Sequence, residues 1–68
     1  MLSRAMDAEL VQAYADEVAW LTARLSRRAE DLESMDPESR EFHDAVLVAD
    51  CLAREIAAVL RKLCGMAV

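Results

Sequence analysis

Glycine and proline are almost absent from this 68-residue chain, which has one of each. Because these two residues mark most turns, their scarcity leaves few places for a loop between regular elements. Gly65 lies close to the end, so the clearest interior turn is the stretch SMDPES at residues 34–39, which contains Pro37. A single glycine also excludes a glycine-rich phosphate-binding loop. The sequence therefore predicts long regular elements joined by one turn.

Aromatic residues are also scarce, at 4% of the chain, although 56% of its residues are apolar. An alanine-rich composition with few aromatics favours helix and disfavours sheet. A chain of this length forms one domain, here residues 1–68, and buries roughly 60% of the surface that it exposes when unfolded. Such small domains are marginally stable unless something else contributes. We therefore expect an all-α domain completed by a partner or by self-association.

Basic residues are outnumbered by acidic ones, and the net charge is −5. This balance opposes a nucleic-acid partner and an anionic membrane surface. The one basic cluster, Arg24, Arg27 and Arg28, directly precedes the acid-rich stretch 30–44. Local ion pairing, for instance of Arg27 with Asp31, explains it better than phosphate binding. We expect neither nucleic acid nor membrane among the partners.

Long apolar runs are missing as well. The longest, AVLVA and IAAVL, are too short to span a bilayer, and the N-terminal MLSRAMDAEL lacks the apolar core of a signal peptide. Cys51 and Cys64 would lie roughly 20 Å apart on one helix, beyond the reach of a disulfide. We interpret both as reduced thiols and expect a cytoplasmic protein.

The residues needed for metal binding or catalysis do not occur in suitable patterns. His43 is the one histidine, and the residue three before it is Arg40, so the Glu-x-x-His pattern of di-iron bundles is not met. Neither cysteine has a second ligand at metal-binding spacing. Carboxylates that are adjacent in sequence, such as Asp16 and Glu17, point in different directions and make poor acid–base pairs. We expect no catalytic, cofactor-binding or metal-binding residues, and no enzyme activity.

Two stretches show the alternating steps of three and four that are typical of helices packed in heptads. The first predicts a helix over about residues 4–34, and its stripe is Val11, Tyr14, Val18, Leu21, Leu25, Arg28, Leu32 and Met35. The second stripe is Phe42, Ala45, Ala49, Leu52, Ile56, Val59 and Leu63. For the second helix Asp36 is the expected N-cap and Pro37 the first helical residue, and Gly65 is the expected stop. The turn is then residues 35–36 and the second helix about 37–64.

A link this short implies an antiparallel two-helix hairpin, an αα-hairpin with coiled-coil-like packing. On a helical wheel, apolar residues remain beside the two stripes, and they leave one bulky face and one face of small residues. The small face consists of Ala8, Ala15, Ala19, Ala53 and Ala57. Exposed apolar surface of this kind marks association, and tryptophan is frequent among the residues that dominate binding energy. The predicted partner-binding residues are those of the bulky face: Met6, Leu10, Trp20, Val48, Leu52 and Val59.

The chain length, the polar turn SMDPES and the aromatic-led second helix REFHDAVLVADCLAREIAAVLRKL form one further pattern. Together they resemble the small helical-hairpin co-chaperones of bacterial type III secretion needle subunits, and the resemblance covers almost the full length. CLAREIAAVL is similar to the leucine–isoleucine rhythm of that family through Leu52, Ile56, Val59 and Leu60. The resemblance implies a non-catalytic protein that binds a helical-repeat chaperone and helps to keep the needle subunit from aggregating before export. It implies no individual contact residue.

A different function is compatible with the same surface. Two hairpins could associate through their alanine faces into a homodimeric four-helix bundle that serves as a scaffold or a regulatory protein. Partner binding through the bulky face predicts that Trp20→Asp abolishes capture of the partner. A bundle built on the alanine face predicts that Ala15→Glu or Ala19→Glu breaks the oligomer. The sequence leaves both alternatives open.

Overall fold

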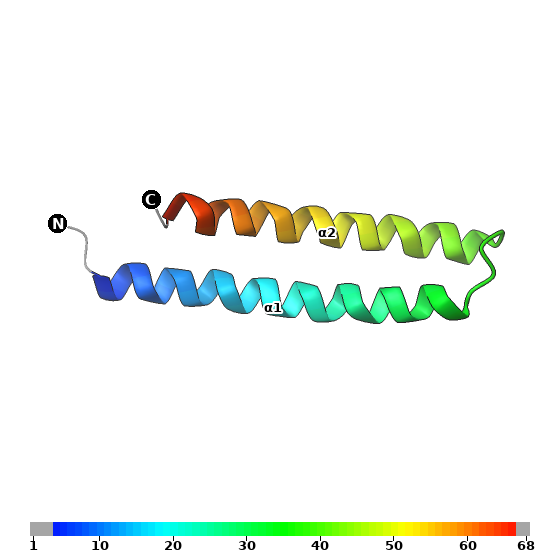
Figure 1. Ribbon diagram of the computed structural model, residues 1–68, viewed down its shortest axis with the longest axis horizontal. Coiled ribbons are helices and arrows are strands. Elements are labelled where there is room, and N and C mark those ends of the chain that lie inside the picture. The colour runs from blue at the N-terminus through cyan, green and yellow to red at the C-terminus, as the bar shows by residue number, and fades with distance from the viewer. Residues whose placement is uncertain (1–3, 67–68) are drawn as a thin grey trace.

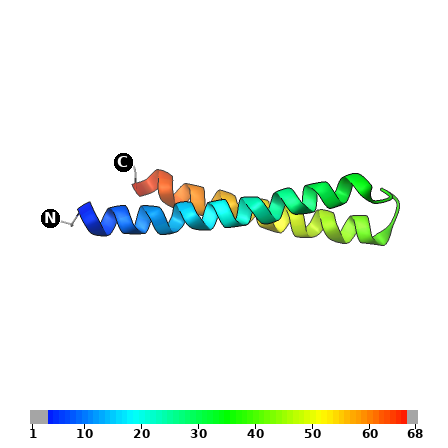
Figure 2. The same cartoon turned by 90° about the horizontal axis from the view of Figure 1, so that it is seen from below.

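The computed structural model describes the backbone of residues 4–66 and the side chains of residues 8–66. These residues form two α-helices, α1 (Arg4–Ser34) and α2 (Arg40–Met66), that lie side by side in opposite directions (Figure 1). The molecule is a rod, with principal extents of 55 × 15 × 12 Å. In the view of Figure 2 the helices cross at a shallow angle, as helices in a coiled coil do. The predicted all-α antiparallel hairpin is confirmed.

The core of the hairpin is a seam of side chains that both helices contribute at steps of three and four. Its buried residues are Leu21, Ala45, Leu52 and Val59. Half-buried side chains pack against the cluster that Leu21, Leu52 and Val59 form, and they are Tyr14, Val18, Leu25 and Ile56. All of these residues belong to the two predicted stripes, so the sequence identified the seam correctly. A core this thin follows from having two layers and no third element to cover them.

Val11 belongs to the predicted stripe of α1 but is 40% exposed. The Lys62 ammonium lies 5.6 Å from the centre of the Tyr14 ring, so Val11, one turn earlier in α1, is level with the last turn of α2. Fewer side chains of α2 are available there to cover it. The seam is therefore less completely covered at Val11, in the half of the hairpin away from the turn (Figure 1).

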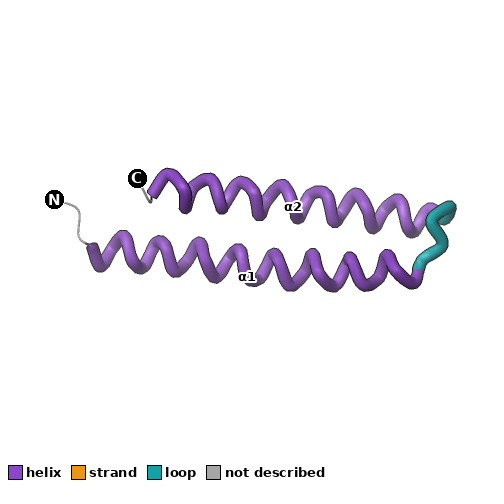
Figure 3. Tube along the Cα trace, viewed as in Figure 1, coloured by secondary structure: helices purple, strands orange, loops and turns teal. Residues whose placement is uncertain are grey.

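The turn is longer than predicted, because it occupies residues 35–39 and α2 begins at Arg40 (Figure 3). The prediction of Asp36 as the N-cap of this helix was wrong by one turn. Ser39 is the N-cap: its Oγ accepts a hydrogen bond from the Phe42 amide at 3.1 Å, and its carbonyl accepts one from the His43 amide at 3.4 Å.

Asp36 instead folds the turn upon itself. Its Oδ1 accepts a hydrogen bond from the Glu38 amide at 3.0 Å, and its carbonyl accepts bonds from the Ser39 amide at 2.9 Å and the Ser39 hydroxyl at 2.7 Å. An aspartate that bonds the backbone two residues later forms an Asx-turn, which competes with helix initiation at the same place. The chain therefore starts α2 at the second of two available caps, and Pro37 lies inside the turn.

Gly65 does not stop α2, which continues to Met66. Its φ is not positive, so it does not adopt the left-handed conformation of a glycine C-cap. The helix thus ends two residues after the predicted end at about residue 64. Gly65 is an ordinary helical residue, and no heavy atom other than those of its own helix backbone and chain neighbours lies within 4 Å of the place where a Cβ would be.

Candidate functional site

Two faces of the hairpin flank the seam, and the heptad geometry assigns residues to them. Along each helix the seam alternates steps of three and four residues. In an antiparallel pair, the residue four positions before the second member of each three-residue step lies on one flank of both helices. The residue four positions after the first member of such a step lies on the opposite flank. Leu10 and Val48, four residues before Tyr14 and Leu52, lie on the first flank, and Trp20 lies on the same side of α1. We call this flank the Trp20 face.

Trp20 is the most exposed aromatic side chain among the described residues, with 60% of its surface accessible. Leu10 and Val48 expose 46% and 38% of theirs. These three residues were predicted to face a partner, and the structure exposes all three on the Trp20 face. That they contact a partner stays a prediction.

The other three predicted contact residues differ. Leu52 and Val59 are each only 5% exposed, because they occupy seam positions and contact α1. Their placement on an exposed bulky face was wrong. A partner reaches them only if the hairpin opens. The side chain of Met6 lies outside the described residues.

A surface hollow of about 310 Å³ lies beside Trp20 on α1. It is lined by Trp20, Ala23, Arg24, Arg27 and Arg28. The Arg24 guanidinium stacks over the indole with its central carbon 4.7 Å from the ring centre, a cation–π contact that holds the indole against its own helix. Arg28 also approaches Asp31, with Nη1 3.9 Å from Oδ2, whereas the predicted pair of Arg27 with Asp31 is not formed. The hollow thus combines an exposed aromatic ring with several guanidinium groups.

The opposite flank, which we call the small-residue face, carries the predicted alanines. Ala8, Ala15, Ala19 and Ala53 are exposed and Ala57 is half-buried. Val46 and Leu60 were not among the residues predicted for this flank. They follow the seam residues Phe42 and Ile56 by four residues and therefore share the flank of Ala53. Val46 is 40% exposed and Leu60 48%. This face is therefore more apolar than a row of alanines.

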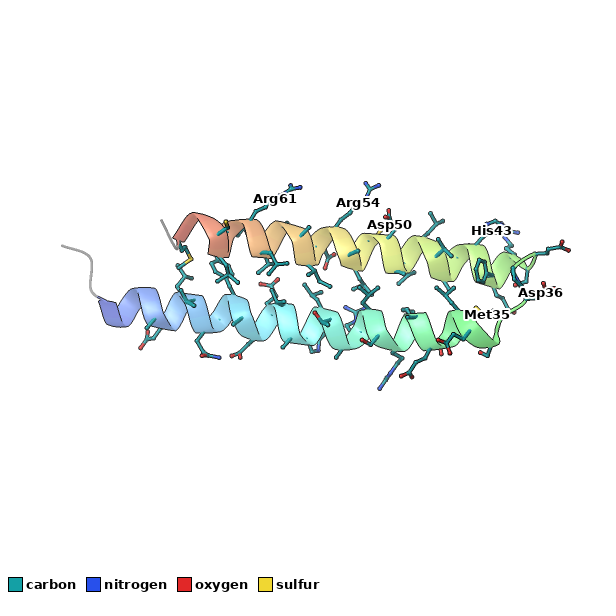
Figure 4. All side chains as sticks on the ribbon, viewed as in Figure 1. Met35, Asp36, His43, Asp50, Arg54 and Arg61 are labelled. Carbon is teal, nitrogen blue, oxygen red and sulfur yellow. The ribbon has the colours of Figure 1, made fainter. Side chains whose placement is uncertain are left out.

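Charge distinguishes the two faces. On the small-residue face the charged residues are Glu33 and Asp50. Asp50 forms an ion pair with Arg54, with Oδ2 3.0 Å from Nε, on the side of α2 that faces away from α1 (Figure 4). The Trp20 face alternates apolar residues with both signs of charge along its whole length. Its charged residues are Glu17, Arg24, Arg27, Asp31, Glu41, Asp44, Glu55 and Lys62.

The remaining predicted features are placed as follows. Cys51 and Cys64 are free and exposed. Among the described residues, no three His, Cys, Asp or Glu side chains are grouped closely enough to hold a metal ion. Neither α1 nor α2, over the part of the chain that the structure describes, contains a segment long and apolar enough to cross a membrane.

No family model, no curated protein and no solved structure matches this chain.

Proposed function

We propose that this chain is a non-catalytic helical hairpin that binds a partner protein through the Trp20 face, in the manner of a co-chaperone. The main observation behind the proposal is the 60% exposure of Trp20 on α1, on the same face of the hairpin as Leu10 and Val48. Tryptophan and arginine are the residues most enriched among those that dominate binding energy. An exposed indole that is already stacked on Arg24 loses little conformational freedom when it enters a pocket.

The chemistry of the face indicates what the partner presents. Trp20 requires an apolar pocket, and Arg24 and Arg27 require carboxylates at its rim, because arginine pairs with carboxylates through two parallel hydrogen bonds. A helical surface with an apolar groove bordered by acidic residues meets both requirements, and it is a common way in which an amphipathic helix is bound. A flat acidic surface without a pocket does not.

The narrower proposal is that the partner is a helical-repeat chaperone and that the complex helps to keep a type III secretion needle subunit from aggregating in the cytoplasm before export. It is supported by the resemblance of the sequence to the co-chaperones of that system and by the hairpin architecture that the two share. The Trp20 face can be the binding surface even if the partner is not a helical-repeat chaperone, because a different helical partner would contact the same residues.

The test compares three tagged proteins in the native host: the wild type, Trp20→Asp and Leu47→Asp. Leu47 is as exposed as Trp20, at 64%, but lies on the outer side of α2, so its variant controls for the loss of one exposed apolar side chain. We expect the wild type and Leu47→Asp to retain a helical-repeat chaperone in stoichiometric amount and Trp20→Asp to lose it, with unchanged helicity by circular dichroism.

A direct titration completes the test. Trp20 is the one tryptophan of the chain, so its fluorescence reports on this face alone. Adding the purified partner should shift the emission to shorter wavelength as the indole leaves water. Capture that is equal for Trp20→Asp and the wild type would contradict the proposed face, and recovery of a partner other than a helical-repeat chaperone would contradict the narrower proposal.

A further inference from the structure

The hairpin has a larger solvent-accessible surface than a typical folded monomer of the same mass. Its solvent-accessible area is 5558 Å² at 7.6 kDa. The scaling relation for monomeric proteins gives about 4,300 Å² at this mass, so roughly 1,300 Å² is in excess. A protein–protein interface of standard size buries about 800 Å² on each partner. The excess is large enough for one such interface on each chain.

The small-residue face is the better candidate for permanent burial. Burying a charge without a partner is costly, and the Trp20 face would bury charges of both signs along its length. The small-residue face offers Asp50, which Arg54 already neutralises at the edge, and Glu33 near the turn. The other exposed side chains of this face carry no full charge: the polar ones are Gln12, His43, Cys64, serine and threonine, and the rest are alanine, valine and leucine.

The shape of the small-residue face is complementary to the same face of a second copy. Its α1 half is a recess that consists of small residues, Ala15, Thr22 and Ala29. Its α2 half is a ridge with two projecting side chains, Val46 and Leu60, which are 40% and 48% exposed. Large residues that face small ones let two helical layers interdigitate.

The levels of ridge and recess also agree. Leu21 and Leu52 belong to one cluster in the seam and Lys62 lies over Tyr14, so the residue numbers of neighbours across the hairpin sum to about 73–76. By this rule Leu60 lies level with Ala15, and Val46 lies level with Ala29. A two-fold axis parallel to the helices preserves every level, and it sets Leu60 of each copy against Ala15 of the other and Val46 against Ala29, without any sliding of one hairpin along the other.

We propose that a second copy of this chain covers the small-residue face, with both turns at the same end, to form a homodimeric four-helix bundle. The Trp20 faces then lie on the two outer sides of the bundle and stay free for a partner. The proposal does not rest on the proposed function, because it uses the opposite flank. The acid-rich turns of the two copies are neighbours in this arrangement, so added salt should strengthen the dimer by screening their repulsion.

The test measures self-association by analytical ultracentrifugation over a wide range of protein concentrations for the wild type, Ala53→Glu and Ala58→Glu. Both alanines are exposed on α2, but Ala53 lies on the small-residue face and Ala58 on the flank of Trp20. We expect a wild-type dimer that tightens with salt, and a roughly hundredfold weaker dimer for Ala53→Glu, since symmetry buries the new carboxylate twice. Ala58→Glu should match the wild type.

A wild-type chain that stays monomeric at every concentration would overturn the proposal. So would a dimer that Ala58→Glu or Trp20→Asp disrupts as strongly as Ala53→Glu, or one that salt weakens. The two proposals fail separately, because Trp20→Asp removes partner capture and leaves the dimer, whereas Ala53→Glu removes the dimer and leaves a Trp20 face that still binds the partner.

A cross-linking experiment covers the case in which Ala53→Glu does not fold. In chains that carry Cys51→Ser and Cys64→Ser, one protein receives Ala15→Cys and another Leu60→Cys, and the two are mixed under mild oxidation. The arrangement places these cysteines of different chains within reach of a disulfide, and we expect a covalent heterodimer. The matched mixture of Ala13→Cys with Ala58→Cys, both on the Trp20 flank, should give none. Equal yields from the two mixtures would overturn the proposal.

Discussion

Replacing Leu52 by alanine decides whether this residue belongs to the seam of the hairpin or to a surface that waits for a partner. The structure leaves 5% of Leu52 exposed and 64% of Leu47, which lies on the same helix, so the same substitution at Leu47 is a matched control. If Leu52 were a partner contact, its truncation would weaken binding and leave the isolated hairpin as stable as before. A seam residue must do the opposite.

The expected loss follows from the carbons removed. Leu52→Ala deletes three buried carbons at about 0.8 kcal/mol each, or about 2.4 kcal/mol in transfer from water. A cavity would add to this loss, but the seam is open along both flanks and its neighbours collapse partly into the space, so we expect about 2–3 kcal/mol in total. A chain of this length is stable by about 3–10 kcal/mol, so the variant loses a large share of its stability. Leu47→Ala should change the free energy of unfolding by less than about 0.5 kcal/mol.

The assay is urea unfolding followed by helical circular dichroism, with all proteins at one concentration because association stabilises the folded state. With a urea dependence of about 1 kcal/mol per molar for a small protein, the midpoint of Leu52→Ala should fall by about 2 M relative to Leu47→Ala. Midpoints that agree within about 0.5 M would refute the assignment of Leu52 to the core and restore it to a binding surface.

Two further changes test the ends of α2. Ser39→Ala removes the acceptor of the Phe42 amide and should lower the free energy of unfolding by about 1 kcal/mol. Ser39→Gly should lower it by only about 0.3 kcal/mol. Equal losses of the two variants in urea unfolding would show that Ser39 is not the cap. Gly65→Ala places a methyl group in open space on a helix and should stabilise the folded chain by about 0.5 kcal/mol. A loss of stability in thermal unfolding would indicate that Gly65 adopts the left-handed conformation after all.

The fold and the seam could be predicted because a single periodicity encodes both. Steps of three and four along each helix select one side for burial, and one proline-containing turn makes the helices antiparallel, so Leu21 and Ala45 were assigned to the seam without a structure. The exact start of α2 could not be predicted. Asp36 and Ser39 are both good N-caps, and the choice depends on hydrogen bonds within the turn that the residue types alone do not reveal.

The candidate site was predicted in part. Trp20, Leu10 and Val48 are exposed as expected, since each lies well to the side of the seam. Leu52 and Val59 were assigned to the bulky face because a helical wheel gives an angle but not the depth at which α1 covers a side chain. Val46 and Leu60 were missed on the opposite face for a related reason: they flank the seam closely, and only the packed structure shows how much of each remains uncovered.

The incomplete cover of Val11, away from the turn, has a consequence for motion. The turn holds one end of the rod through the hydrogen bonds that Asp36 accepts from Glu38 and Ser39, while at the other end Val11 is 40% exposed. Pairing the helical turns next to residues 35–39 closes only a short loop, and each further pair of helical turns costs little additional loop-closure entropy. The hairpin should therefore form from the turn and fray from the opposite end. Amide hydrogens should then exchange along a gradient, fastest near Leu10 and slowest around Leu21 and Leu52. The helices should therefore separate most often at the end of the Trp20 face that carries Leu10, and we expect a partner to make its first contacts there.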